Sequence, residues 1–453
     1  MSSRFIPHNT LNLALCALLG AFCAVSYRKY ASYSAPLREP DVTVVLLNWA
    51  RFTNVQTIVA GLCGPSLDDV VKEIFVWNNN PNHTVGVEEF APCPARKLRV
   101  YNSPENLYFQ ARFIACSKAS TVFCFIQDDD YIVKPEIIRA VRSRIADQDI
   151  FLNPPEERLS SQWLSIMSPP TTFGFSWLGY GSMLLRRHAA AFLQLMDDLQ
   201  MPDEERKMAD NYYTILRNRM PEIWVGSAHP LSNESAFTVG EEGQARNRDH
   251  INRAVRYLDT LVANRTERPY FSLSFTTPEP RTLVHTPCQT GTCVVETTIR
   301  SLPETVSKYP LAQDIFKREA ELTSLSAAAG SDISPFSQAV DSDMATFFRS
   351  AGDARAGDSI LLDNLDVVST MVDWVWMVDP STALAIQSTP LSVSKNGLEW
   401  TTTPITPNCL ASGAGIVECH FTSGLPARYL RIKLSSNWTS PWCIYETWLQ
   451  IAT

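Results

Sequence analysis

Ser120-Thr121-Val122-Phe123-Cys124-Phe125-Ile126-Gln127-Asp128-Asp129-Asp130-Tyr131 joins a short apolar run to three adjacent carboxylates. The run from Val122 to Ile126 is β-branched and aromatic and too short for a buried helix, so it predicts a fully buried strand. The three carboxylates repel one another, and a divalent cation would relieve the repulsion because hard oxygen ligands suit Mg²⁺ or Mn²⁺. The alternative is a solvated acidic turn before a helix that starts near Pro135.

Strands and helices alternate around this segment, which predicts a parallel βαβ sheet. In open α/β sheets, ligands bind where the carboxyl ends of the strands meet. Aromatic, amide and cationic groups beside a metal would serve a base, a ribose and a diphosphate. We expect strands at 42–47, 73–77 and 98–101, helices at 54–62 and 107–118, and polar strand-end residues at Asn48, Trp49, Arg51, Asn78, Asn79, Asn102 and Asp128–Asp130.

The bulk composition predicts a folded protein and argues against nucleic-acid binding. The chain has 453 residues, of which 45% are hydrophobic and 19% are charged, and this composition excludes a disordered chain. The length predicts about three domains. The net charge of -8 comes without a basic patch, which argues against a nucleic-acid partner.

The N-terminal region predicts entry into the secretory pathway. Residues 11–26 are apolar but shorter than a comfortable membrane span, so a signal peptide and a signal anchor both remain open. Nine of the eleven cysteines lie beyond this segment, in a compartment where disulfides persist. Close spacing favours bridges between Cys288 and Cys293 and between Cys409 and Cys419, and Cys63 with Cys93 is a plausible third. Cys116 and Cys124 have the surroundings of core positions.

A series of motifs along roughly residues 41–260 resembles the GT-A glycosyltransferases, and among them the exostosin-like family 64. The motifs occur in a fixed order, and three of them follow the aspartate triplet. They are Leu47-Asn48-Trp49-Ala50-Arg51, Val76-Trp77-Asn78-Asn79, Asn102-Ser103, Arg112-Phe113, Asp128-Asp129-Asp130, then Gly179 to Leu184 with His188, Met208 to Tyr213, and Gly243 to Asn252. Ala209 departs from the pattern, because the family has Glu at this position.

The resemblance implies a metal-dependent, retaining transferase that uses a UDP-activated N-acetylhexosamine. It implies that Asp128 and Asp130 hold ribose and Mn²⁺ (or Mg²⁺), while Asp129 reaches the metal through water. Asp210 would lie beside the anomeric carbon, and Arg246 or Arg248 would stabilise the departing phosphate. The resemblance assigns donor binding to Trp49, Arg51, Asn78, Asn79, Asn102, Asn106 and Arg112.

Two of these residues have simpler interpretations. Arg51 could form an ordinary surface ion pair, which is the common fate of an isolated arginine. Asp210 could cap the helix that follows it, because aspartate starts helices well, although a capping carboxylate can also be catalytic.

The chain changes character after residue 265. Residues 266–330 are a connector that is rich in Pro and Thr at its start, and residues 331–453 are rich in predicted strands. Asn396-Gly397 predicts a hairpin. Residues 335–348 and 427–432 resemble a discoidin-like (coagulation-factor type C) jelly roll, a module that commonly binds glycans or lipid headgroups. A purely structural sandwich is the alternative.

The sequence therefore predicts an α/β GT-A fold, with a Rossmann-like nucleotide-sugar-binding sheet, followed by an all-β jelly-roll sandwich. The expected regions are a signal segment with stem (1–40), a transferase domain (41–265), a connector (266–330) and a sandwich (331–453). We expect the protein to move a sugar from a UDP-sugar to a glycan or glycoprotein acceptor. It would be held in the Golgi or ER membrane in type II orientation by its N-terminal segment, or secreted if that segment is cleaved.

Two alternatives remain open at this stage. One is a GT-A transferase of another family, inverting and with a different nucleotide sugar. The other is a glycan-binding protein whose transferase domain has lost activity.

Overall fold

The structure is a computed structural model, and it describes most of the chain beyond residue 38. Short ranges within the described part are left out, and the apolar segment 11–26 and most of the connector 266–330 lie outside it. The described residues are 39–154, 164–167, 170–218, 221–226, 228–231, 240–264, 283–300, 320, 324, 334–365, 372–403, 406–413 and 415–451.

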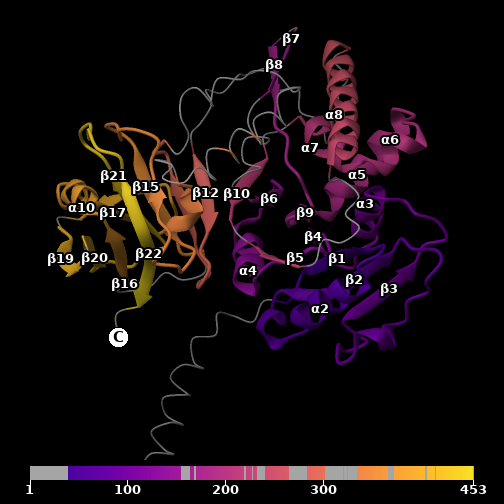
Figure 1. Ribbon diagram of the computed structural model, residues 1–453, viewed down its shortest axis with the longest axis horizontal. Helices are drawn as coiled ribbons and strands as arrows, with labels where there is room; N and C mark the ends of the chain where they lie inside the picture. Colours follow the sequence, from indigo (N-terminus) through magenta and orange to yellow (C-terminus); the bar gives the residue numbers. More distant parts are fainter. Residues whose placement is uncertain are drawn as a thin grey trace, which may run out of the picture. The chain divides into compact units, whose positions relative to one another are not determined.

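The helices and strands occur in two runs along the chain (Figure 1). The first run comprises β1 (Val42–Asn48), α2 (Phe52–Leu62), β2 (Val71–Asn78), β3 (Leu98–Asn102), α3 (Gln110–Ser117), β4 (Phe123–Gln127), β5 (Tyr131–Ile132), α4 (Pro135–Arg144), β6 (Ile150–Asn153), β7 (Leu164–Met167), β8 (Pro170–Phe173), β9 (Ser182–Leu185), α5 (Arg186–Asp198), α6 (Asp203–Lys207), α7 (Asp210–Leu216), β10 (Glu222–Val225), β11 (His229–Pro230) and α8 (Gly240–Ala263).

The second run is almost entirely strand. It comprises β12 (Val284–Pro287), β13 (Val294–Thr297), β14 (Phe348–Arg349), β15 (Ser359–Asp363), β16 (Val372–Val378), α10 (Pro380–Gln387), β17 (Leu391–Ser394), β18 (Thr401–Thr402), β19 (Asn408–Gly413), β20 (Ile416–Ser423), β21 (Tyr429–Lys433) and β22 (Cys443–Ile451).

Four parallel strands in the order β4, β1, β2, β3 form the part of the sheet that carries the aspartates. Each predicted strand and helix of this region is confirmed to within a few residues. Because the strands are parallel, Asn48, Asn78 and Asn102 end three of them in adjacent register. The triplet Asp128–Asp130 follows the end of the fourth strand directly.

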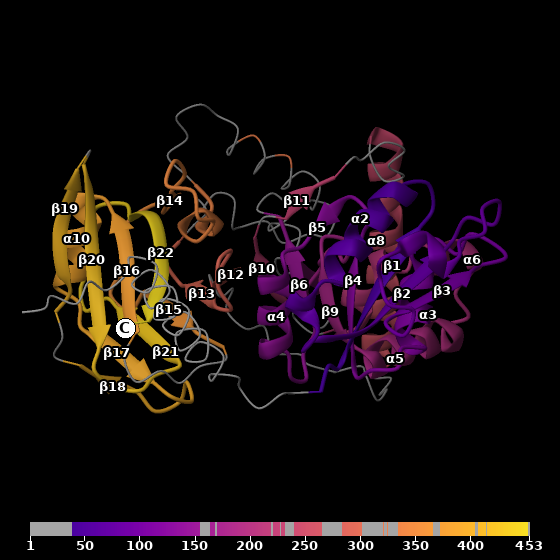
Figure 2. The ribbon, with the colours of Figure 1, turned by 90° about the horizontal axis from the view of Figure 1, so that it is seen from below.

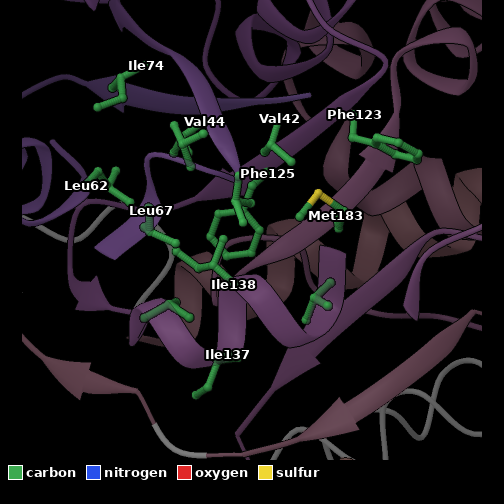
Figure 3. Close-up of a cluster of buried hydrophobic side chains, with 14 of the residues drawn as sticks. Val42, Val44, Leu62, Leu67, Ile74, Phe123, Phe125, Ile137, Ile138 and Met183 are labelled. Atoms are coloured by element: carbon green, nitrogen blue, oxygen red, sulfur yellow. The ribbon is translucent and has the colours of Figure 1, made fainter. Parts of the chain in front are cut away.

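Both faces of β1, β4 and most of β2 are buried, which explains their nearly continuous apolar sequences, whereas the edge strand β3 is largely exposed. Along β1, Val44 and Leu46 pack in one apolar cluster, whereas Val45 packs in another on the opposite face. Figure 3 shows the first cluster, in which Ile137 and Ile138 of α4 approach the side of the sheet that carries Phe125. Helices α3, α5, α7 and α8 contribute to the second cluster. Removal of a fully buried side chain of this size from water stabilises the fold by about 1.5–3 kcal/mol.

Beyond β4 the sheet continues through strands of both directions, and Figure 2 allows them to be followed. Antiparallel β9 joins β4 to β6, and parallel β10 and β12 follow. Strand β12 pairs with β13, and β13 pairs in turn with β15 of the C-terminal region. The sequence predicted only a connector at 266–330, but this range contributes β12 and β13, which join β10 to β15 within one sheet. The predicted domain boundaries stay predictions.

The C-terminal region has two antiparallel layers over a shared apolar core. One layer contains β15, β21 and β17, and the other has the order β14, β22, β16, β20, β19. Trp374, Trp376 and Trp442 are almost completely buried in the core, so they are packing residues and are not exposed to a ligand. The hairpin predicted at Asn396-Gly397 connects β17 to β18, and Gly397 has a φ of 75°.

Four disulfides lie in the described part of the chain. The bridges predicted for Cys63–Cys93, Cys288–Cys293 and Cys409–Cys419 are confirmed. We interpreted Cys116 and Cys124 as core positions, and this interpretation missed their bond: both are buried and are linked to each other. The end of α3 and the strand β4 bring them close together, a proximity that an eight-residue separation does not reveal. Among the described residues, no helix is both long and apolar enough to cross a membrane.

The buried carboxylate of Asp149, just before β6, contacts residues of β9 and α5 and residues in and directly after α7. It accepts hydrogen bonds from the backbone N–H of Leu185 (3.1 Å) and the Tyr213 hydroxyl (2.7 Å), contacts His188 Nδ1 (2.7 Å), and pairs with Arg217. Burial alone would raise the pKa of Asp149, but Arg217 and the hydrogen-bond donors outweigh it and lower this pKa. Helix α7 is therefore fixed against β6 and the start of α5.

We expect Asp149→Asn to lower the free energy of unfolding at pH 7 by about 3–5 kcal/mol, because Arg217 would lose its buried partner. Since the pKa of Asp149 is lowered in the folded state, its stabilisation is present above the unfolded value of about 3.9 and is lost as the pH falls through the folded pKa. Urea unfolding at several pH values measures both effects.

Asp147→Asn is the matched control, because Asp147 also pairs with an arginine, Arg187, but its side chain is 90% exposed. This variant should unfold like the unchanged protein at every pH. Equal losses in the two variants would show that the buried Asp149 contacts do not carry this stability.

Candidate functional site

The main chain fixes the aspartate triplet where it leaves β4. The Asp128 N–H donates to the carbonyl of Gly179 (2.7 Å), and the Asp130 carbonyl accepts from Leu231 (2.7 Å). The three side chains are only partly exposed, at 30% for Asp128, 10% for Asp129 and 20% for Asp130. They are therefore held against the protein and do not form a freely solvated turn.

Arg112 connects the triplet to a distant part of the chain. This arginine of α3 is 1% exposed, and its guanidinium forms ion pairs with Asp128 and with Asp210, the first residue of α7. Its position over the Phe109 ring, 4.8 Å from the centroid, adds a cation–π contact. Three residues predicted for the site, from three different elements, thus meet in one buried cluster.

Arg51 supplies the second positive charge. It precedes α2, and its guanidinium lies 2.5 Å from Asp129 Oδ1 and 3.2 Å from Asp130 Oδ2. Its side chain is 19% exposed, so the arginine belongs to the carboxylate cluster and does not form the solvent-exposed ion pair of the simpler interpretation.

Negative charge is in excess at this site, because four carboxylates surround the guanidinium groups of Arg51 and Arg112. Burial raises the pKa of Asp129 to about 6, with Arg51 opposing the shift. It raises the pKa of Asp210 to about 7, although Arg112 acts in the opposite direction. The pKa of Asp130 is also raised, first by burial and then by Asp128. A further cation would stabilise all of these anions.

The donor atoms suit a hard divalent ion. Asp130 Oδ1 and Asp210 Oδ1 are buried and accept no hydrogen bond among the residues that the structure describes. Within those residues, no three His, Cys, Asp or Glu side chains are gathered closely enough to hold a metal ion. Mn²⁺ and Mg²⁺ need fewer than three protein side chains, because they commonly bind through one or two carboxylates together with the phosphates of a substrate. Asp130 therefore fits such an ion, and the predicted metal role of Asp128 stays a prediction.

The strand-end asparagines form a ladder. Asn48 donates to Asn78 and Asn78 donates to Asn102, both over 2.8 Å, so the amides tie the ends of β1, β2 and β3 together. Asn78 is completely buried, and it also donates to the carbonyl of His83. In this structure the ladder holds the strand ends, and the predicted contacts of Asn78 and Asn102 with a donor stay predictions.

The other predicted residues occupy different places. Trp49 is 45% exposed at the end of β1. The Asn79 amide donates to the carbonyl of Tyr108 (3.1 Å), and Asn106 accepts from the N–H of Tyr108 (2.8 Å). Arg246 and Arg248 lie on α8, where Arg246 lines a cavity and Arg248 is exposed. Their predicted role at a departing phosphate stays a prediction.

Gly179 is a site residue whose role sequence reasoning missed. A Cβ on this glycine would lie 1.9 Å from Asp128 Oδ2 and 2.7 Å from its Cγ. The carboxylate therefore occupies space that only glycine leaves open. The segment Gly179-Tyr180-Gly181 was part of the motif series, but only the fold shows that one of its glycines receives Asp128.

Comparison with known proteins finds likeness among solved structures alone, since no protein family matches the chain and no curated protein does. The chain is similar to residues 1–349 of S. aureus TarS in complex with UDP, at 13% identity over 49% of this chain and 70% of that chain, with a TM-score of 0.33. It is similar to the mannosyltransferase PcManGT from Pyrobaculum calidifontis in complex with GDP-Man and Mn²⁺, at 13% identity over 57% of this chain and 87% of that chain, with a TM-score of 0.30. A third is CBM32-1 from a family 31 glycoside hydrolase of Clostridium perfringens, at 17% identity over 26% of this chain and 84% of that chain, with a TM-score of 0.20.

We expect Gly179→Ala to force the Asp128 carboxylate away from Arg112, because the new methyl group and the carboxylate need the same space. Overpacking of this kind lowers the free energy of unfolding by about 1–3 kcal/mol. Urea unfolding and a crystal structure of the variant measure the two effects. Gly352→Ala is the control, since its Cβ would meet nothing within 4 Å. An unmoved Asp128 in the Gly179→Ala structure would contradict the interpretation.

Proposed function

We propose that the protein is a metal-dependent glycosyltransferase that uses a nucleotide sugar. The observation that carries the proposal is the buried Arg112, which holds Asp128 at the end of β4 beside Asp210 of α7. The first carboxylate lies where parallel sheets bind nucleotides, and the shared pairing with Arg112 brings the second carboxylate close to it. The excess of carboxylates over guanidinium groups supports a cation that would arrive with a diphosphate.

The finer proposal is a UDP-activated N-acetylhexosamine, transferred with retention of configuration to a glycan or glycoprotein. It rests on the motif series along roughly residues 41–260. In the transfer, the bond between the anomeric carbon and the phosphate oxygen breaks, and UDP leaves with the electron pair. The acceptor hydroxyl oxygen forms the new bond to the anomeric carbon, and its proton passes to the departing diphosphate.

The proposed site residues have distinct roles in this transfer. Asp210 stabilises positive charge on the sugar, which becomes oxocarbenium-like as the bond to phosphate lengthens. Arg112 keeps Asp210 and Asp128 at a fixed separation, so the sugar and the diphosphate are positioned together. Asp128 and Asp130 would hold Mn²⁺ or Mg²⁺, which when bound would neutralise charge that develops on the diphosphate.

We also propose a luminal location in the secretory pathway, with the N-terminal segment as a membrane anchor or a cleaved signal. The four disulfides support an oxidising compartment, because such bonds are rare in the cytosol. The C-terminal sandwich would then contact glycans or other surface groups of the acceptor.

The test separates binding from turnover. Asp130→Asn removes one charge and one strong oxygen ligand, so Mn²⁺-dependent UDP binding should weaken and the rate should fall about a thousandfold. Asp210→Asn should keep UDP and Mn²⁺ binding within a few-fold while turnover falls. Calorimetry with UDP and Mn²⁺ measures the binding, and release of UDP from UDP-sugars measures the turnover.

Undiminished metal dependence of UDP binding in Asp130→Asn would show that the metal assignment is wrong. UDP and Mn²⁺ binding without turnover of any nucleotide sugar by the unchanged protein would instead favour a binding protein that has lost transferase activity.

A further inference from the structure

A cavity of about 670 Å³ is lined by Arg246, one of the two arginines predicted for the departing phosphate, and the other lining residues have no role in the proposed mechanism. Tyr108, the end of α6 with Met208, and the first half of α8 line it. Its volume falls in the range of small-molecule sites, which is about 300–1,000 Å³. The cavity is therefore large enough for one or two sugar rings.

Hydrogen bonds connect the walls of this cavity to α7, the helix that begins with Asp210. The Tyr212 hydroxyl lies 2.8 Å from Nδ1 of His250, a cavity residue, and Asn211 donates to Asn247 of α8 over 3.4 Å. Met208, another lining residue, precedes α7 by two positions. The helix that forms one wall of the cavity is thus hydrogen-bonded to the element that supplies the proposed catalytic carboxylate.

Tyr108 has a backbone conformation that tyrosine seldom adopts. Its φ is 47°, in the left-handed region, and such a residue costs about 1–3 kcal/mol unless its surroundings impose it. Here the surroundings do impose it. The Asn106 side chain accepts from the Tyr108 N–H, and the Asn79 side chain donates to the Tyr108 carbonyl. The N–H of the next residue, Phe109, donates to the Lys207 carbonyl (3.0 Å). Strain of this kind concentrates at binding and catalytic sites. The chain thus fixes this aromatic residue at the cavity wall.

The charges of the lining are balanced. Its carboxylates are Glu204, Glu242 and Asp249, and its cations are Lys207, Arg246 and Arg253. Burial lowers the pKa of His250, so this ring adds no positive charge at neutral pH. Such a wall can accept hydrogen bonds from hydroxyl groups and donate others to ring and hydroxyl oxygens. The lining therefore has no net positive charge that would favour an anionic sugar over a neutral one.

We propose that this cavity is the acceptor site and that it binds an uncharged, hydroxyl-rich sugar. One face of the sugar ring packs on Tyr108, and the charged side chains of α6 and α8 hydrogen-bond its hydroxyl groups. The inference rests on the proposed function, because it names the acceptor class for that same reaction. The acceptor would then approach the candidate site from the side of α6 and α8.

The experiment compares transfer with hydrolysis in the full chain. UDP release from UDP-N-acetylglucosamine and from other UDP-sugars is measured without acceptor, then with neutral p-nitrophenyl glycosides and with p-nitrophenyl glucuronide. We expect the unchanged protein to transfer to a neutral glycoside at least about tenfold better than to the glucuronide.

Tyr108→Gly removes the ring without backbone strain, because glycine adopts a positive φ readily. It should lower the ratio of transfer to hydrolysis about tenfold, mainly through KM for the acceptor, since aromatic packing contributes roughly this factor. Tyr108→Phe keeps the ring and should stay within about threefold of the unchanged protein. Gln200→Gly is the matched control, because Gln200 has a φ of 51° and does not line the cavity.

Glu242→Lys provides a second test that leaves the packing undisturbed, since this side chain is exposed on the first turn of α8. It should shift the preference from the neutral glycoside towards the glucuronide.

The outcomes separate the two proposals. If no UDP-sugar or other nucleotide sugar is turned over by the unchanged protein, the proposed function fails, and the acceptor site fails with it. If hydrolysis and transfer both occur, but Tyr108→Gly leaves their ratio unchanged or the glucuronide is the better acceptor, only the acceptor-site inference is overturned.

Discussion

The fold around the site depends on one buried guanidinium that faces two carboxylates. Arg112 lies almost entirely out of water between Asp128 and Asp210. Burial would lower its pKa, but the two carboxylates outweigh burial and raise it, so the charge is retained. Since an unpaired buried charge costs several kcal/mol, each of the three groups fixes the other two. Helix α7 therefore cannot drift from the sheet without leaving a charge unpaired in the interior.

The sequence predicted most of this arrangement, because periodicity and adjacency are local properties. Apolar runs located β1 to β4, and the polar residues after them located Arg51 and Asp128–Asp130 at one edge. What the sequence could not show depends on contacts between distant residues. The ladder of Asn48, Asn78 and Asn102 requires strand register, and the space for Asp128 beside Gly179 requires the path of a later loop.

A disulfide, two short strands and one backbone conformation were not predicted from the sequence, for related reasons. Cys116 and Cys124 look like ordinary core residues, because short spacing between an expected helix and an expected strand gives no direction for their side chains. The two strands within 283–300 are four residues each, too short for periodicity to distinguish them from loop. The positive φ of Tyr108 arises from side-chain amides on either side of it, and no local composition signals it.

The continuity of the sheet has a consequence for how the protein can be divided. Trp224 of β10 pairs with His285 of β12. Arg144 of α4 pairs with Glu222 of β10, Glu296 of β13 and Asp363 of β15. A fragment that ended at residue 265 would lose β12 and expose β10 as an open edge strand, and Arg144 would keep only one of its acidic partners. Open edges recruit other chains. Such a fragment would be prone to aggregate even with every proposed catalytic residue in place, and its inactivity would say nothing about chemistry.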